Sequence, residues 1–167
     1  MTGNGFPINP EGLRSLYGDN VPALHEVRLR SINLNWRGPT VTLRLDLPTL
    51  PEVVPQAWED AGVDTVQCQF QFLAASDISL EQWKPPAVVC IEMTRRGENR
   101  RMQVTAYGDG AKLEFICSDA VLVGHISGFK KQDESRNGGR HLFTRKVDSL
   151  RHASIPETYE KTFYERL

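Results

Sequence analysis

Apolar and polar residues alternate along several stretches of this 167-residue chain, and this pattern constrains the fold most strongly. From residue 40 to residue 47 every second side chain is apolar: Val41, Leu43, Leu45 and Leu47. A period of two places apolar side chains on one face of a strand and polar ones on the other. Because strands of parallel sheets are usually buried on both faces, the alternation predicts a mainly β protein with antiparallel strands.

Turn signals divide the chain into seven to eight predicted strands. They are expected at residues 27–36, 40–47, 65–73, 87–95, 100–107, 112–118 and 120–129, with a weaker one at 141–147. The apolar phase changes near Arg30-Ser31, which predicts a β-bulge. Gly108-Asp109-Gly110 predicts a hairpin, and Pro85-Pro86 is expected to close a short separate segment at 79–83. Such a chain forms an antiparallel sheet, strongly bent, or a β-sandwich.

One or two short helices accompany the strands. Asn9-Pro10-Glu11 predicts a helix start, and Gly18 predicts its end. A helical turn is expected around Trp58, before Gly62. We therefore expect a flexible N-terminus at 1–9, one β-rich domain at 10–147, and a basic, aromatic tail at 148–167. The apolar spacing of that tail suits a helix.

The charge of the chain excludes a strong electrostatic role for the whole molecule. Its formal net charge is −1, so it has no overall field that attracts nucleic acid or an anionic membrane. No apolar run reaches the ~20 residues of a membrane helix, and the N-terminus does not resemble a signal peptide. Three widely spaced cysteines, Cys68, Cys90 and Cys117, are typical of reduced thiols. A cytoplasmic protein without membrane contact is expected.

Neither metal binding nor catalysis is indicated by a recognisable motif. The four histidines, His25, His125, His141 and His152, are not spaced from one another or from a cysteine as metal ligands are. There is no nucleophile elbow and no cysteine at a predicted helix start. Glu92 and Glu114 can be paired across neighbouring predicted strands, but without a pocket a solvent-exposed face is the preferred interpretation. We expect no catalytic residue, no metal and no cofactor.

Phosphate and nucleic-acid binding are likewise weakly indicated. Gly108-x-Gly110 lies between two predicted strands, whereas a dinucleotide fingerprint needs a helix after the glycines. A basic cluster flanks another predicted hairpin: Arg95, Arg96, Arg100 and Arg101. Aromatic residues that stack on bases are not interleaved with these arginines. An exposed, solubilising turn is the preferred interpretation.

The remaining candidates for function lie on the surface and would contact a protein partner. An exposed tryptophan beside an arginine, such as Trp36 with Arg37, is a typical interface hot spot. Trp58 lies near a turn and Trp83 precedes Pro85-Pro86, so each is a further candidate. Three uncharged glutamines lie on one predicted sheet face: Gln67, Gln69 and Gln71. This face is either exposed to solvent or covered by another layer, and the second alternative suits partner binding.

Parts of this pattern resemble the immunity protein 50 family. The resemblance covers about residues 13–129 and rests on Val27-Arg-Leu-Arg-Ser-Ile, Leu43-Arg-Leu-Asp-Leu-Pro, Trp58, Val66-Gln-Cys-Gln-Phe, Leu113-Glu-Phe-Ile-Cys and Val123-Gly-His-Ile-Ser-Gly-Phe. The closing Glu160-Lys-Thr-Phe-Tyr-Glu-Arg is also similar. The resemblance implies an antitoxin of a bacterial polymorphic toxin system, which binds a cognate protein toxin domain and blocks it without catalysis. It implies no catalytic residues.

Two other functions remain open on the residues alone. One is a small-ligand-binding or enzymatic β-module built around His125, with Cys117 and Asp119 nearby in the sequence. The other is a nucleic-acid accessory domain that uses the arginine cluster and the basic tail. A concave pocket near His125, or salt-dependent nucleic-acid binding, would distinguish them from an immunity protein.

Overall fold

The computed structural model describes residues 11–97, 99–131 and 141–144. Within them, one antiparallel sheet has seven strands in the order β5-β4-β1-β2-β3-β6-β7. The strands are β1 (Val27–Asn35), β2 (Thr40–Asp46), β3 (Thr65–Phe72), β4 (Ser76–Arg96), β5 (Arg101–Ser118), β6 (Val121–Phe129) and β7 (Leu142–Phe143). The prediction of a mainly β protein with an antiparallel sheet is confirmed. The predicted flexible N-terminus and C-terminal tail lie outside the described residues.

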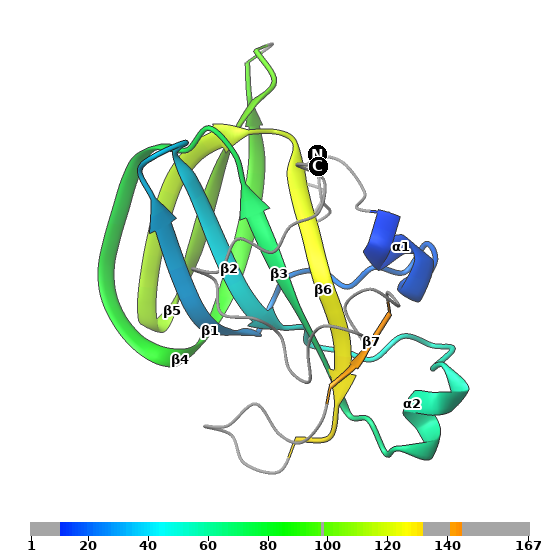
Figure 1. The fold of residues 1–167 in the computed structure, drawn as a ribbon. Coiled ribbons are helices and arrows are strands. Elements are labelled where there is room, and N and C mark those ends of the chain that lie inside the picture. Colours follow the sequence, from blue (N-terminus) through cyan, green and yellow to red (C-terminus); the bar gives the residue numbers. More distant parts are fainter. Residues whose placement is uncertain (1–10, 98, 132–140, 145–167) are drawn as a thin grey trace.

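Two short helices pack beside the sheet (Figure 1). Helix α1 (Glu11–Tyr17) buries Leu13 and Tyr17 and is followed by Gly18, whose positive φ of 63° suits a helix end. Helix α2 (Gln56–Asp60) buries Trp58, which is only 3% exposed. A Cβ atom on Gly128 of β6 would lie 2.7 Å from the Trp58 ring. The absence of a side chain at Gly128 therefore lets α2 pack closely against β6.

The predicted bulge in the first strand is confirmed. The ladder between β1 and β2 changes register between Leu29 and Ser31. Leu29 faces Leu45 before the change, and Ile32 faces Leu43 after it. The extra residue keeps apolar side chains on one face although their spacing in the sequence changes from odd to even positions.

Strands β4 and β5 are each longer than the sequence predicts, and two predictions here are wrong. Segments 79–83 and 87–95 form one strand, β4, which passes through the cis Pro85–Pro86 bond, and 100–107 and 112–118 form one strand, β5. Gly108-Asp109-Gly110 is thus a bend and not a hairpin. Gly108 lies opposite Val89, where a Cβ atom would come within 2.1 Å of the Val88 carbonyl oxygen. A glycine is required because the two bent backbones approach closely.

The bent β4–β5 ribbon curves behind β1, β2, β3 and β6 and encloses the core (Figure 1). The rings of Phe72 in β3 and Phe115 in β5 meet edge to face, with centroids 5.1 Å apart. The amide of Asp119, just after β5, donates to the carbonyl of Arg100, just before it (2.9 Å). The ends of β5 are therefore close together, and a single sheet produces two facing layers.

The last described strand is shorter than predicted. The structure shows β7 at Leu142–Phe143, paired with Gly128 and Ser127 of β6. Residues 145–147 of the predicted strand lie outside the described part of the chain.

Candidate partner-binding surface

The turn between β1 and β2 presents an exposed tryptophan in an ordered setting. Trp36 is 81% exposed, and the Arg37 guanidinium carbon lies 5.2 Å from the centroid of its ring. The Arg37 amide donates a hydrogen bond to Asn35 Oδ1 (3.0 Å), which holds the turn. A large amphipathic ring that is already positioned loses little conformational entropy on binding. Trp36 and Arg37 are therefore suited to contact a partner.

The other predicted contact residues lie elsewhere and are less accessible. Trp58 belongs to α2 and is buried between that helix and β6. Trp83 of β4 is half-buried and packs against the core, opposite Ala111 of β5. The structure therefore does not gather the three tryptophans on one surface.

The glutamine row of β3 is buried within the molecule. Gln67 and Gln69 are 0% exposed, and Gln71 is 8% exposed. Their register neighbours on β2 are Asp46, Arg44 and Thr42, which are buried too. A side chain at 0% exposure cannot meet a partner without rearrangement. The glutamines therefore do not belong to the surface that this structure presents.

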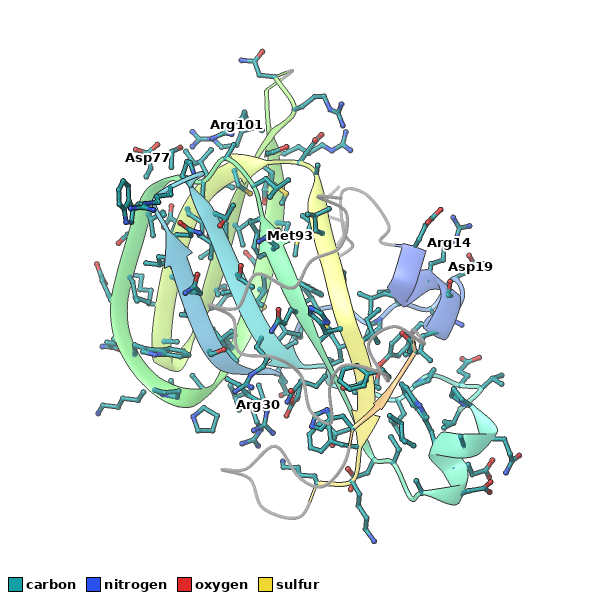
Figure 2. All side chains as sticks on the ribbon, in the orientation of Figure 1. Arg14, Asp19, Arg30, Asp77, Met93 and Arg101 are labelled. Atoms are coloured by element: carbon teal, nitrogen blue, oxygen red, sulfur yellow. The ribbon has the colours of Figure 1, made fainter. Side chains whose placement is uncertain are left out.

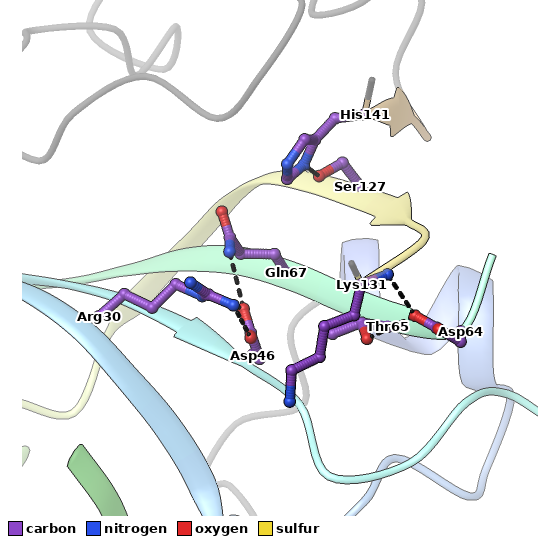
Figure 3. A network of polar contacts seen from close by, with 8 residues as sticks. All are labelled: Arg30, Asp46, Asp64, Thr65, Gln67, Ser127, Lys131 and His141. Atoms are coloured by element: carbon purple, nitrogen blue, oxygen red, sulfur yellow. Dashed lines mark hydrogen bonds and ion pairs between the residues drawn. The ribbon is translucent and has the colours of Figure 1, made fainter. Parts of the chain in front are cut away.

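A buried ion pair lies at one end of this polar face (Figure 3). Arg30 donates through Nε to Asp46 Oδ1 (2.8 Å) and through Nη2 to Oδ2 (2.6 Å). Gln67 Nε2 donates a further hydrogen bond to Asp46 Oδ1 (2.7 Å). The side chains of Arg30 and Asp46 are 4% and 6% exposed. We call Arg30, Asp46 and Gln67 the buried polar cluster; both oxygens of its carboxylate accept hydrogen bonds.

A serine–histidine contact that sequence reasoning missed lies nearby. Ser127 Oγ and His141 Nδ1 are joined by a hydrogen bond of 2.7 Å (Figure 3). The His141 ring also stacks on Phe129 at 4.5 Å between centroids. Such a pair can activate a serine only where substrate reaches it, but Ser127 is 0% and His141 2% exposed. No motif links the two residues in the sequence, because they meet only when β7 pairs with β6.

The three cysteines are free thiols in the described structure. Cys68 is fully buried, and burial together with the nearby Asp46 carboxylate raises the pKa of its thiol. Burial also raises the pKa of Cys117 to about 12. Cys90 is half-buried. A raised thiol pKa disfavours the nucleophilic thiolate, so Cys68 and Cys117 are packing residues.

The region proposed for a ligand site around His125 is closed. His125 is 2% exposed and has a positive φ of 52° in β6. Asp119 is 4% exposed and forms an ion pair with Arg100, Nε to Oδ1, at 3.3 Å. Within the described ranges, no group of three His, Cys, Asp or Glu side chains could hold a metal ion. Neither described helix is long and apolar enough to cross a membrane.

The arginine cluster surrounds a real hairpin, since Arg96 of β4 pairs with Arg101 of β5. Arg101 Nη1 donates to the carbonyl of Ala74 (2.9 Å), and its Nη2 donates to Ser76 Oγ (3.3 Å). Figure 2 shows Arg101 near Asp77, at the start of β4. Arg100 forms an ion pair with Asp119. Two of the four arginines, Arg100 and Arg101, therefore hold the hairpin against neighbouring segments of the protein.

The carboxylate pair that the sequence suggested does not form. Glu92 lies opposite Thr105, and Glu114 lies opposite Ser79. Both side chains are exposed, in agreement with the preferred interpretation of a solvent-exposed face. Glu92 instead accepts a hydrogen bond from Tyr107 Oη (3.0 Å), and Glu114 accepts one from Gln103.

The fold and the surface define the class: an antiparallel β protein with a buried polar cluster at Arg30, Asp46 and Gln67 and an exposed turn that carries the pair Trp36 and Arg37. Residues 9–127, more than two thirds of the chain, match the family model of Immunity protein 50. The chain belongs to the immunity protein 50 family. Searches of curated proteins and of solved structures found no match.

Proposed function

We propose that this protein binds a cognate bacterial toxin domain and neutralises it without catalysis. Membership of the immunity protein 50 family is the observation that carries the proposal. The closed Ser127–His141 pair supports a binding role, because its side chains are not accessible to a substrate. Inhibition would follow from covering the active site or substrate groove of the toxin over about 800 Å² per partner.

The proposal includes the setting in which the protein acts. It belongs to a polymorphic toxin system and works in the cytoplasm of the cell that makes the toxin. The free thiols of Cys68, Cys90 and Cys117 support a reducing compartment. The toxin is the partner, and no cofactor takes part.

Trp36 and Arg37 form the proposed centre of the toxin contact. Their exposure and their stacked arrangement support this choice. Trp36→Ala is expected to raise the Kd for the toxin about 30-fold or more, which is typical of a hot-spot tryptophan. Val53→Ala is the matched control, because Val53 is 83% exposed and lies between β2 and α2. Equal affinity of both variants would remove Trp36 from the interface.

Co-expression tests the function directly. The chain is expressed in bacteria together with the toxin domain that its neighbouring gene encodes. Restored growth and a joint peak on gel filtration are expected. Continued killing without a complex would overturn the proposal.

A further inference from the structure

Three chain connections meet at one end of the molecule (Figure 1). The carbonyl of Pro39, in the turn between β1 and β2, accepts a hydrogen bond from the amide of Ala75 (2.8 Å), in the link between β3 and β4. The neighbours of Ala75 on either side bind Arg101 of β5, through the carbonyl of Ala74 (2.9 Å) and through Ser76 Oγ (3.3 Å). These hydrogen bonds place the β1–β2 turn and the β4–β5 hairpin on either side of one short link.

The arginines of the hairpin border this junction. Arg96 lies opposite Arg101 in the β4–β5 ladder, and directly opposed side chains of a strand pair share a face. Because Arg101 reaches the link between β3 and β4, Arg96 lies on the face of the hairpin that borders the link. Arg100 precedes β5 and forms an ion pair with Asp119, and its side chain is 75% exposed. The hairpin therefore adds cations to the end of the molecule that carries the β1–β2 turn.

The charge of this end is mainly positive. We call it the arginine rim, and its aromatic and charged side chains are Trp36, Arg37, Asp77, Arg95, Arg96, Arg100 and Arg101. Five arginines stand against Asp77 and the Asp119 partner of Arg100, and they are still in excess when Glu98, outside the described residues, is counted. The whole chain has a formal net charge of −1. The positive charge is therefore a property of the rim and not of the molecule.

Two arginines of the rim have no counter-charge within the described part of the chain. Arg37 stacks on the Trp36 ring, and Arg96 is exposed on the hairpin; neither forms an ion pair with a described residue. A guanidinium binds a carboxylate through two parallel N–H groups, which fixes both position and direction. Tryptophan and arginine are also enriched among the residues that dominate binding energy in protein interfaces. The rim thus presents an apolar ring with cations around it that can each bind a carboxylate.

The mixed composition of the rim favours a protein partner over a nucleic acid. A nucleic acid presents a dense row of phosphates, and its bases stack on several aromatic side chains. Among the described residues of the rim, Trp36 is the single exposed aromatic ring. Asp77 lies beside Arg101 and would repel a phosphate there (Figure 2). An acidic protein surface can instead place apolar side chains around the tryptophan and carboxylates around the arginines.

We propose that the arginine rim binds an acidic surface of the toxin. Trp36 enters an apolar pocket of that surface, and Arg37 and Arg96 bind toxin carboxylates. The opposite charges attract the two proteins before they touch, so association is fast at low salt and slows as salt screens the charges. This inference rests on the proposed function and names the chemistry of the partner surface.

Association kinetics at two salt concentrations test the inference. The probe is the immobilised toxin domain encoded by the neighbouring gene, and the full chain is added in about 0.05 M or about 0.5 M NaCl, where the screening lengths differ about threefold. The association rate constant of the wild type is expected to be about tenfold or more lower at the higher salt. At the lower salt, Arg96→Glu is expected to reduce it about tenfold or more, whereas Arg96→Lys keeps the charge and stays within about threefold of the wild type.

Arg14→Glu is the matched control. It changes the net charge of the chain by the same amount, but Arg14 lies on α1, away from the rim, with its side chain 61% exposed (Figure 2). Its association rate constant is expected to stay within about threefold of the wild type at both salt concentrations. The salt dependence of the wild type does not require any variant to fold.

The outcomes separate this inference from the proposed function. If the complex forms at a rate that neither salt nor Arg96→Glu changes, the acidic partner surface is wrong and neutralisation stands. If Arg96→Glu abolishes binding of a 20-nucleotide RNA or self-association of the free chain, and toxin binding is unchanged, the rim serves that other partner and the inference is overturned. If no complex forms with the toxin at any salt concentration, both proposals fail together.

Discussion

At the residue scale, the Asp46 carboxylate shows how this protein stabilises charge away from water. It accepts three hydrogen bonds, two from Arg30 and one from Gln67, at 6% side-chain exposure. The Arg30 guanidinium carbon also lies 5.8 Å from the centroid of the Phe129 ring. A buried ion pair is costly to desolvate, so its partners depend strongly on each other. The buried polar cluster therefore has a structural role.

Asp46→Ala is expected to destabilise the protein by about 3–5 kcal/mol, because it leaves the buried Arg30 charge without its partner. Urea unfolding followed by circular dichroism measures this loss. Asp19→Ala is the control: Asp19 lies 3.7 Å from Arg14 with its side chain 92% exposed (Figure 2). The control is expected to change stability by less than about 0.5 kcal/mol. An equal loss of unfolding free energy in both variants would contradict the claim that burial makes the Arg30–Asp46 ion pair important for stability.

Thiol labelling provides a second prediction at this scale. In the native protein at pH 8, Ellman's reagent is expected to react with Cys90 before Cys68 or Cys117. Burial removes the latter two from the reagent and raises their pKa values, so little thiolate is present. All three should react in denaturant. Mass spectrometry that found Cys68 labelled as fast as Cys90 in the native state would be inconsistent with the described core.

At the scale of elements, the joint bend of β4 and β5 determines the shape of the molecule. Gly108 lies opposite Val89, close to Pro85 and Pro86 in the other strand. Read alone, Pro-Pro and Gly-Asp-Gly each signal a chain turn, which is why the sequence predicted separate strands there. The bend is a property of two paired strands, and single-strand patterns cannot reveal it. The β1 bulge was predictable because it shifts the apolar phase within one strand.

Gly108→Ala tests the bend. The new methyl group would overlap the Val88 carbonyl oxygen, so the two strands must separate. We expect a loss of about 1–3 kcal/mol in unfolding free energy. Asp109→Ala is the control, because Asp109 is the exposed neighbour of Gly108. It should lower the free energy of unfolding by less than about 0.5 kcal/mol. Chemical denaturation of the two variants side by side makes the comparison, and a neutral Gly108→Ala would argue against the close approach.

At the scale of the whole molecule, the sequence predicted the antiparallel sheet but only part of the candidate surface. Trp36 and Arg37 are exposed and adjacent, as an interface pair requires. The burial of Gln67, Gln69 and Gln71 could not be predicted from the sequence. Polar residues that alternate with apolar ones usually lie on a solvent-exposed face, whereas here that face is buried. The exposure of Leu34 and Leu80, at 43% and 39%, could not be predicted either, because an apolar residue in a strand is usually buried. Their exposure depends on where β1 and β4 part, which is a long-range property.

The central claim is that this protein neutralises a toxin by binding it. The most direct test is a titration of the purified toxin domain, encoded by the neighbouring gene, with this protein while the activity of the toxin is measured. The account predicts that activity falls in proportion to added protein and disappears near one equivalent. Full toxin activity in the presence of a large excess of this protein would contradict it.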